Sequence, residues 1–397
     1  MSLSILIMTL PPLTGGVPAK AQILAEHLRS RGHRVTVSHY ATFRDYPELV
    51  VPSWQLLSGR QPQIRHGRCF GDFPCVAVGC RFPELEFTYY RMTPSWRDLI
   101  EKHDRHIAVG GTVLVSYPLA VSGVPHLVWC ASTMIEDRID RRRSMPWARR
   151  LFDRFVVGSV QRTMEIEILK GPAHFMAVSS HALKSLVGTG GVAERFSRVP
   201  IPVDMHRFTP PESPSDPGIV GFAGRTNDPR KNLPLLFGAV KHVLDRGGKV
   251  SLRLTGDGTP ALQQLVRRLG IADKVTWMGW LRADALAQFF RELDVFVIPS
   301  SHEGLNLAGI EAMACSVPVV ATRCGGPEDY VVDGETGTLV SPDPTAMAGA
   351  IEAIVRSREI RNRLGKNARL FVERHFSHGQ FASALANAWQ QTWGDRP

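Results

Sequence analysis

Short apolar runs alternate with amphipathic segments along nearly the whole chain. In the first half the runs SILIM, RVTVSHY, HIAV, HLVW and FMAV predict buried strands, and in the second half GIVGF, KVSLRL, KVTWM, VFVIP and VPVVA do the same. Strands separated by helical segments are typical of parallel sheets that are covered by helices. The pattern therefore predicts an α/β fold with one sheet in each half of the chain.

A Pro- and Ser-rich passage, RFTPPESPSDPGIVGF, separates the two sets of strands and favours a domain boundary. We expect two doubly wound, Rossmann-like domains, one over 1–207 and one over 208–376. The terminal helix, about 377–397, is expected to pack back on the first domain. Ligands of such sheets bind beyond the carboxyl ends of the strands, so we expect the domains to face each other across a cleft.

One segment, 41–95, has weak periodicity and many Pro, Gly and aromatic residues, and its pattern predicts no definite role. The chain has no run of eighteen apolar residues, which argues against a membrane span. Its start, MSLSILIMTLPPLTGG, is typical of a first buried strand rather than of a secretion signal. We therefore expect a cytoplasmic protein.

The six cysteines predict neither zinc nor disulfides. Cys69, Cys75 and Cys80 have spacings that match neither a zinc ribbon nor a CxxC redox pair. We expect free thiols instead.

The positive charge of the chain, +10 in total, is concentrated in its first half. Residues 1–210 carry 26 − 17 = +9, and the remainder carries 21 − 20 = +1. No nucleic-acid-binding motif accompanies this charge, so we expect no nucleic acid partner.

The densest basic block is 136–155, where arginines alternate with apolar residues (Arg141, Arg142, Arg143, Arg149, Arg150 and Arg154 with Trp147, Leu151, Phe152 and Phe155). The block predicts either contact with an anionic membrane surface or acceptor, or a solvated helix face with core-facing aromatics. The first alternative would place the protein peripherally at the inner face of the membrane.

Two glutamates, Glu303 and Glu311, lie in the otherwise apolar stretch SSHEGLNLAGIEAMACSVPVV. A helix is expected from about Leu305 to Cys315, so the backbone N–H groups of Gly304, Leu305 and Asn306 would attract an anion such as a phosphate. Eight helical residues span about 12 Å, which allows the two carboxylates to grip opposite ends of an extended ligand such as a nucleotide sugar. The alternative is structural, with a helix-entry acid and a buried acid paired to a distant arginine.

The segment GIVGFAGRTNDPRKNLPLLFGAV leads from a strand through Arg225 and Lys231 to a helix that begins near Leu233. Fixed cations at a strand end suit a diphosphate. At the chain start, Gly15 and Gly16 join the first strand to a helix, and two glycines let backbone approach a ligand closely. A tight strand-to-helix turn would need the same two glycines.

Taken together, these segments resemble the retaining glycosyltransferases of family 4, which have the two-domain GT-B fold. The resemblance implies that 1–207 is the acceptor-side domain and that 208–376 binds the nucleotide-sugar donor. EGLNLAGIEAMACSVPVVA is similar to the Glu-x7-Glu signature of the family, AGRTNDPRKN to its Gly-Arg…Lys element, and CGGPEDYVVDGETGTLV to the segment that follows. The resemblance implies that Arg225 and Lys231 hold the donor diphosphate. It also implies that Glu303 contacts the transferred sugar and Glu311 the ribose.

Two positions depart from the family pattern. Cys130 occupies the position where the family often has a histidine near the donor sugar, and a thiol is a poor replacement for an imidazole hydrogen bond. Ser316 replaces the glycine that usually ends the signature helix in a left-handed conformation, at a cost of about 1 kcal/mol.

The resemblance implies transfer of a hexose or N-acetylhexosamine from a nucleoside diphosphate sugar, with UDP-sugar favoured, to an acceptor that the sequence does not identify. The basic first half fits an anionic or lipid-linked acceptor. With no Asp-x-Asp motif, we expect no metal and no other cofactor, since a helix N-terminus, Arg225 and Lys231 would neutralise the leaving diphosphate. The sequence does not define the oligomeric state. A nucleotide-sugar epimerase and a non-catalytic nucleotide-sugar-binding subunit remain as alternatives.

Overall fold

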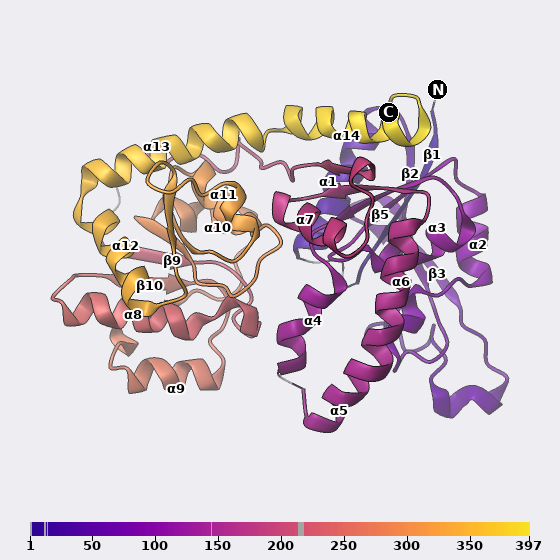
Figure 1. Cartoon of the computed structure of the whole chain (residues 1–397), viewed down its shortest axis with the longest axis horizontal. Helices are drawn as coiled ribbons and strands as arrows, with labels where there is room; N and C mark the ends of the chain where they lie inside the picture. Colours follow the sequence, from indigo (N-terminus) through magenta and orange to yellow (C-terminus); the bar gives the residue numbers. More distant parts are fainter. Residues whose placement is uncertain (1, 12, 14, 144, 213–217) are drawn as a thin grey trace. The chain divides into compact units, whose positions relative to one another are not determined.

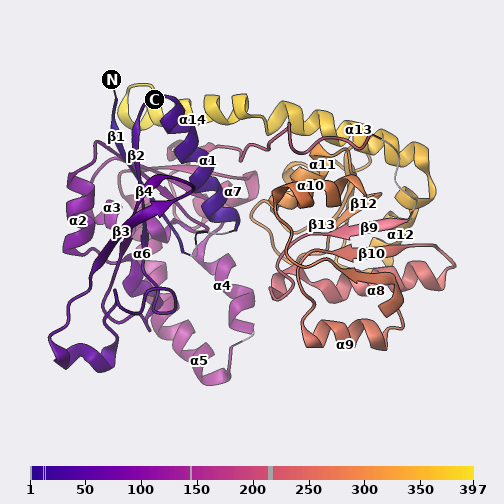
Figure 2. The same ribbon diagram turned by 180° about the vertical axis from the view of Figure 1, so that it is seen from behind.

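The chain folds into two compact units in this computed structural model, which describes residues 2–11, 13, 15–143, 145–212 and 218–397 (Figures 1 and 2). The side chains of residues 140, 141, 143 and 283 also lie outside the description. Unit 1 comprises Met1–Val199 and Ala382–Pro397, and unit 2 comprises Pro200–Phe381. The units therefore divide at Val199 and Pro200, whereas the sequence placed a boundary after residue 207.

Unit 1 is built on an eight-stranded sheet in the order β3-β4-β2-β1-β5-β6-β7-β8. Every neighbouring pair is parallel except β3 and β4, which run antiparallel. The strands are β1 (Ser4–Thr9), β2 (Arg34–Tyr40), β3 (Ile64–Cys69), β4 (Phe73–Val78), β5 (Arg105–Val109), β6 (His126–Cys130), β7 (Ala173–Ala177) and β8 (Phe196–Arg198).

Helices cover both faces of this sheet. They are α1 (Gly16–Ser30), α2 (Pro94–Glu101), α3 (Tyr117–Ser122), α4 (Met134–Arg143), α5 (Trp147–Phe152), α6 (Gly158–Lys170) and α7 (Ser180–Gly188). One core is formed where α2, α3 and α6 meet the sheet, with Trp96, Leu119 and Ile168 against Val128. Short helical turns connect several elements, among them η1 (Ser53–Ser58), η3 (Val113–Ser116) and η4 (Asp153–Val157).

The C-terminal helix α14 (His378–Trp393) belongs to unit 1 from Ala382 onward. The indole of Trp389 is fully buried and stacks on His33 with ring centroids 6.0 Å apart. Arg105 donates to Asp395 at 2.9 Å, which fixes the end of the chain to β5. A long apolar side chain and an ion pair together hold this helix on the first unit.

Unit 2 is built on a six-stranded, fully parallel sheet in the order β11-β10-β9-β12-β13-β14. The strands are β9 (Ile219–Phe222), β10 (Ser251–Leu254), β11 (Val275–Trp277), β12 (Val295–Ile298), β13 (Val319–Thr322) and β14 (Gly337–Val340). The helices are α8 (Leu233–Asp245), α9 (Pro260–Arg268), α10 (Ala283–Arg291), α11 (Leu307–Ala314), α12 (Pro344–Arg356) and α13 (Arg358–His375).

In both views α8 and α12 lie on one side of the second sheet, and α10, α11 and α13 lie on the other (Figures 1 and 2). Leu236 and Ile351 are fully buried against Val220 and Val297 in the core beneath α8 and α12. Both sheets follow the α/β pattern that the alternating runs predicted, which confirms two Rossmann-like units.

All six cysteines are free and buried. Among the described residues, no helix is both long enough and apolar enough to cross a lipid bilayer.

Candidate active site

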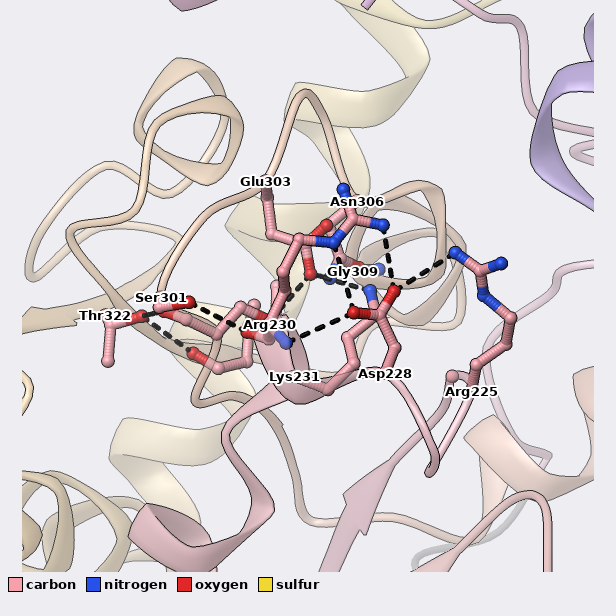
Figure 3. Close-up of polar contacts among 12 residues, drawn as sticks. Arg225, Asp228, Arg230, Lys231, Ser301, Glu303, Asn306, Gly309 and Thr322 are labelled. Carbon is pink, nitrogen blue, oxygen red and sulfur yellow. Dashed lines mark hydrogen bonds and ion pairs between the residues drawn. The ribbon is translucent and has the colours of Figure 1, made fainter. Parts of the chain in front are cut away.

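The carboxylate of Glu303 is held on one of its two oxygens. Its Oε1 accepts hydrogen bonds from Lys231 Nζ at 2.7 Å, Ser300 Oγ at 2.6 Å and Asn306 Nδ2 at 2.8 Å (Figure 3). These donors come from the loop after β9 and from the loop between β12 and α11, at the carboxyl edge of the parallel sheet. Glu303 Oε2 accepts no hydrogen bond from any residue that the structure describes. One oxygen is therefore saturated while the other is open to a ligand.

Glu303 is ionised in this setting. Burial acts to raise its pKa, but the charge of Lys231 and the hydrogen bonds from Lys231, Ser300 and Asn306 outweigh burial and hold the pKa below its ordinary value. The Glu303 and Lys231 side chains are only 11% and 16% exposed. The site thus contains a fixed, desolvated ion pair rather than a solvated surface pair.

The backbone around Glu303 is fixed from the other side by the segment after β13. Glu303 N donates to the Cys324 carbonyl at 2.8 Å, and Gly326 N donates to the Glu303 carbonyl at 2.7 Å. A Cβ at Gly326 would lie 2.4 Å from the Cα of Leu305. Only glycine permits this approach, which explains the second glycine of the motif CGGPED.

The helix that follows Glu303 begins two residues later than the sequence predicted, at Leu307 rather than Leu305. Asn306 is its N-cap and has a left-handed backbone (φ 67°), which extends the loop before the helix can start. The Asn306 side chain accepts from Gly309 N at 3.0 Å through Oδ1 and donates to Glu303 through Nδ2. One amide therefore caps the helix and orients the carboxylate.

The backbone N–H groups of Gly304, Leu305 and Asn306 donate no hydrogen bond to a described residue. Three adjacent free donors beside a helix N-terminus suit an anion. The free N–H groups are consistent with the predicted binding role of these three residues, which stays a prediction.

Two arginines share Asp228 in the loop after β9. Arg230 binds both carboxylate oxygens of Asp228, at 3.1 and 2.8 Å, whereas Arg225 makes a single contact to Oδ2 at 3.1 Å. The Arg225 side chain is 65% exposed, and Figure 3 shows it at the outer edge of this cluster. Arg225 is therefore a loosely held cation that can turn to a ligand, while Arg230 is a fixed support of the loop.

This loop is joined to the loop after β12 through the backbone. Ser301 N donates to the Arg230 carbonyl at 2.8 Å, and Thr322 Oγ1 donates to the Ser300 carbonyl at 2.5 Å. The predicted cations Arg225 and Lys231 and the predicted acid Glu303 thus lie on loops that are fixed to each other.

Glu311 lies on α11, and its side chain makes no hydrogen bond or ion pair with a described residue. Burial raises its pKa to about 8, although the charge of Arg207 acts in the opposite direction. The side chain is partly exposed. The sequence allowed a purely structural role in which Glu311 pairs with a distant arginine. No described arginine forms that ion pair.

In unit 1, Gly15 is the N-cap of α1 and has a positive φ of 101°. A Cβ at Gly15 or Gly16 would meet no atom within 4 Å, so this turn has open space on its outer side. The geometry leaves the backbone accessible, and a binding role for the two glycines stays a prediction.

The predicted substrate contact of Cys130 is wrong for this structure. Cys130 ends β6 with its side chain in the core beside Val128 and Met134, and it has no exposed surface. Burial raises the pKa of its thiol to about 12, although the charge of Lys20 acts to lower it. A neutral, enclosed thiol packs as a small hydrophobe and cannot contact a ligand.

Lys20 is a buried cation that the sequence reading did not single out. Its ammonium donates to the Gly110 carbonyl at 2.9 Å and to the Trp129 carbonyl at 3.4 Å. Burial lowers its pKa to about 8. No sequence pattern around KAQILAEHL distinguished Lys20 from a solvated lysine.

Ser316 has the left-handed backbone that the family pattern requires, with φ 60°. It follows the C-cap Cys315 of α11 and donates its N–H to the Met313 carbonyl at 2.9 Å. The predicted geometry at this departure is confirmed.

Part of the chain matches the model of a known family. The family model described as glycosyl transferases group 1 matches residues 217–357. A D-inositol 3-phosphate glycosyltransferase of Catenulispora acidiphila is 35% identical over 219 residues, which make up 49% of this chain and 49% of that protein. The match to such curated relatives thus spans about half of their length.

The fold has similar solved structures over its whole length. A sucrose-phosphate synthase from Thermosynechococcus elongatus has a TM-score of 0.77 at 21% identity, over 99% of each chain. HepE of Anabaena, solved in complex with UDP, has a TM-score of 0.74 at 18% identity, over 98% of this chain and 100% of that one. The chain therefore has the GT-B fold of glycosyltransferases, and its residues 217–357 are similar to the glycosyl transferases group 1 family.

Proposed function

We propose that the protein is a retaining glycosyltransferase that moves a hexose or N-acetylhexosamine from a nucleoside diphosphate sugar, most favourably a UDP-sugar, to an acceptor. The single observation that carries the proposal is the state of Glu303. Its Oε1 is saturated by Lys231, Ser300 and Asn306, while its Oε2 is open beside free backbone N–H groups. The UDP complex of the similar fold of HepE supports the choice of nucleotide.

The diphosphate of the donor would bind where positive charge is available. Arg225 has one replaceable contact, so its guanidinium can turn to phosphate oxygens. Lys231 can donate to a phosphate oxygen while it still holds Glu303, because an ammonium has three donor hydrogens and Glu303 takes one of them. The N–H groups of residues 304–306 add neutral donors to the same anion. Charge that develops on the leaving diphosphate would thus meet preorganised donors, which is the largest contribution in most such reactions.

The sugar would bind through Glu303. An ionised carboxylate accepts hydrogen bonds from hydroxyl groups, and only Oε2 is available for this. Because Oε1 is held by three donors, the carboxylate keeps its orientation when the sugar arrives. A fixed acceptor of this kind positions the anomeric carbon for attack.

Glu311 would take the ribose of the donor. Its carboxyl has no competing partner among the described residues, and a carboxylate offers two oxygens to the paired 2′ and 3′ hydroxyls. Binding of the ribose requires the ionised form, so the raised pKa of Glu311 gives the proposal a pH dependence.

We propose a front-face reaction. The acceptor oxygen forms a bond to the anomeric carbon, the bond from that carbon to the phosphate oxygen breaks, and the acceptor proton passes to the departing phosphate oxygen. This route keeps the anomeric configuration and needs no dedicated side-chain base. Lys231 and Arg225 would neutralise the diphosphate without a divalent ion, so activity is expected to persist in EDTA.

For the acceptor we propose an anionic molecule, phosphorylated or lipid-linked. The basic first half of the chain favours it, and the similar Catenulispora protein is named for an inositol phosphate. We place the reaction at the inner face of the membrane, with residues 136–155 toward anionic lipid. Arg141 and Arg143 of that block have side chains outside the described residues.

The test begins with thermal unfolding in the presence of UDP-, GDP- and ADP-sugars. The proposal expects one nucleotide series, UDP first, to raise Tm, because a ligand that binds only the folded state stabilises it. The best donor is then offered to phosphorylated and lipid-linked acceptors, and the anomeric configuration of the product is read by NMR. A new nucleotide sugar formed without acceptor would establish the epimerase, and binding without transfer or hydrolysis would establish the non-catalytic subunit.

A further inference from the structure

Five large apolar side chains are exposed on the segment formed by α5 and η4. Trp147 is 76% and Phe155 66% exposed, and Leu151, Phe152 and Val156 are exposed beside them. We name these five residues the α5 surface. Isolated exposed apolar residues are normal, but a contiguous group of this size marks a site of interaction.

The same segment presents unpaired positive charge. Arg149 and Arg154 are exposed and form no ion pair with a described residue, and the Arg154 guanidinium lies 5.5 Å from the centre of the Phe155 ring. Asp153 is the only acid between 147 and 157, and it is buried against Arg138 and Arg142. The outward side of the segment is therefore apolar and cationic.

A second exposed apolar group lies at η1, in the segment to which the sequence assigned no role. Leu57 is 99% and Trp54 65% exposed, Leu56 is exposed beside them, and the rings of Phe43 and Trp54 pack edge to face with centroids 5.6 Å apart. Arg44 is exposed next to Phe43 and forms no ion pair with a described residue. We name Phe43, Arg44, Trp54, Leu56 and Leu57 the η1 tip.

The two groups lie on the same side of unit 1. In Figure 1 and in the reverse view of Figure 2, α5 and the indigo-violet turn η1 are both at the foot of the unit, whereas both chain termini are at its top. A flat surface can therefore contact both groups at once.

We infer that unit 1 docks on an anionic lipid bilayer through two points, the α5 surface and the η1 tip. Aromatic and aliphatic side chains that enter the headgroup region, with arginines at its level, are the combination that interfacial segments use. The inference rests on the membrane placement in the proposed function and deepens it, because it names the side chains that dock and adds a second point at η1.

Other occupants fit the two groups less well. A symmetric dimer formed through this segment would bring Arg149 and Arg154 of both copies into one interface, where the single acid of the segment, Asp153, is already paired with Arg138 and Arg142. Nucleic acid would attract the arginines and stack the aromatic rings, but Leu57, Leu151 and Val156 would gain nothing from it. A bilayer accommodates the aliphatic, aromatic and cationic side chains together.

The experiment is sedimentation of the full chain, without donor, with vesicles of phosphatidylcholine alone and of phosphatidylcholine and phosphatidylglycerol in equal parts. The expected result is binding to the anionic vesicles only, with release at high salt. Absence of binding by the unaltered protein, or equal binding to both vesicles, would overturn the inference whatever the variants do.

Three pairs of substitutions test the two points separately: W147S with F155S, R149E with R154E, and W54S with L57S. Each pair is expected to lower the vesicle partition coefficient by at least about tenfold, because each removes apolar insertion or about 1 kcal/mol per arginine at the membrane surface. The matched controls lie in unit 2: W280S removes a tryptophan that is 68% exposed, and R267E with R268E reverses two exposed arginines of α9. They are expected to change partitioning by less than about twofold.

An equal loss in the controls would show general adhesion and overturn the inference. Loss with the α5 pairs but not with the η1 pair would overturn the second docking point. If light scattering shows a dimer that the same substitutions dissociate, the two groups form an interface between copies instead. Transfer to a soluble acceptor, assayed without vesicles, separates a failure of docking from a failure of the proposed function.

Discussion

Lys231 Nζ lies 2.7 Å from Glu303 Oε1, and this ion pair joins the loop after β9 to the loop before α11. Each partner has a different expected ligand, a phosphate for Lys231 and a sugar hydroxyl for Glu303. In the absence of a donor, the ammonium and the carboxylate therefore neutralise each other and hold each other in orientation. Breaking the ion pair is therefore expected to affect both catalysis and stability.

Lys231→Met is expected to lower kcat/KM by at least about a hundredfold, because it removes a preorganised donor to the leaving diphosphate. It is also expected to destabilise the protein by about 1–3 kcal/mol at neutral pH, because Glu303 would remain buried and charged without its partner. Chemical denaturation and steady-state kinetics measure the two effects. Lys241→Met is the control, since Lys241 is a half-exposed lysine paired with Asp245 on α8.

The destabilisation expected for Lys231→Met depends on pH. The folded-state pKa of Glu303 is below its ordinary value of 4.5, so its ion pair contributes stability above pH 4.5 and loses it as pH falls through the folded pKa. The difference between Lys231→Met and the unaltered protein is therefore expected to narrow in acid. A second substitution, Glu303→Gln, is expected to restore stability without activity, and recovery of activity in the double variant would contradict the assigned roles.

Arg225→Ala is expected to leave the fold intact and abolish most of the transfer. The side chain is 65% exposed and has one contact to Asp228, which Arg230 also holds, so Tm is expected to stay within about 1 °C. Loss of its charge at the diphosphate is expected to lower kcat/KM by about a hundredfold. Arg268→Ala on α9 removes another exposed arginine as the control, and unchanged turnover in Arg225→Ala would refute the role.

The sequence predicted the strands that carry the site because they are fully buried and bounded by breakers. It did not predict β3 and β4: the antiparallel β3, IRHGRC, is exposed at nearly every position and carries no apolar signal. The edge strand β14 was also absent from the prediction, because GTLV is short and only half buried.

The grouping of Arg225, Lys231 and Glu303 came from the resemblance to a family, and the structure brings these residues together. The sequence did not predict the residues that hold these side chains in place. Asp228 and Ser300 look like ordinary loop residues, and each contacts a residue three positions away, Arg225 and Glu303, through the local conformation of its own loop. Cys130 was misplaced because the last residue of a strand can face the core or the ligand, and the sequence does not decide between them.

Ser316→Gly is expected to stabilise the protein by about 0.5–1 kcal/mol. Ser316 has φ 60°, a conformation that costs a residue with a Cβ but costs glycine little, although the greater freedom of glycine in the unfolded chain offsets part of the gain. Thermal or chemical denaturation gives the difference. Ser357→Gly is the contrasting variant: Ser357 has a negative φ and caps α13 through Ile360 N, so its loss is expected to destabilise by about 1 kcal/mol.

Glu311 gives the site a dependence on pH that runs opposite to that of Glu303. Its pKa in the folded protein is about 8, above its ordinary value of 4.5, so the folded state binds a proton that the unfolded state releases between these values. Stability from this group is therefore present below pH 4.5 and decreases as pH rises toward 8. The affinity for the donor is expected to increase as pH rises, because two ribose hydroxyls require the ionised carboxylate.

The affinity for UDP is accordingly expected to rise between pH 6.5 and pH 8.5 in the unaltered protein, by about tenfold if ionisation of Glu311 is the controlling step. Glu311→Gln is expected to bind more weakly, to lose this pH dependence, and to be more stable than the unaltered protein at pH 8.5. Calorimetric titration and denaturation at each pH measure both quantities on the same samples. If the variant kept the full pH dependence of binding, another group would control it, and Glu311 would not hold the ribose.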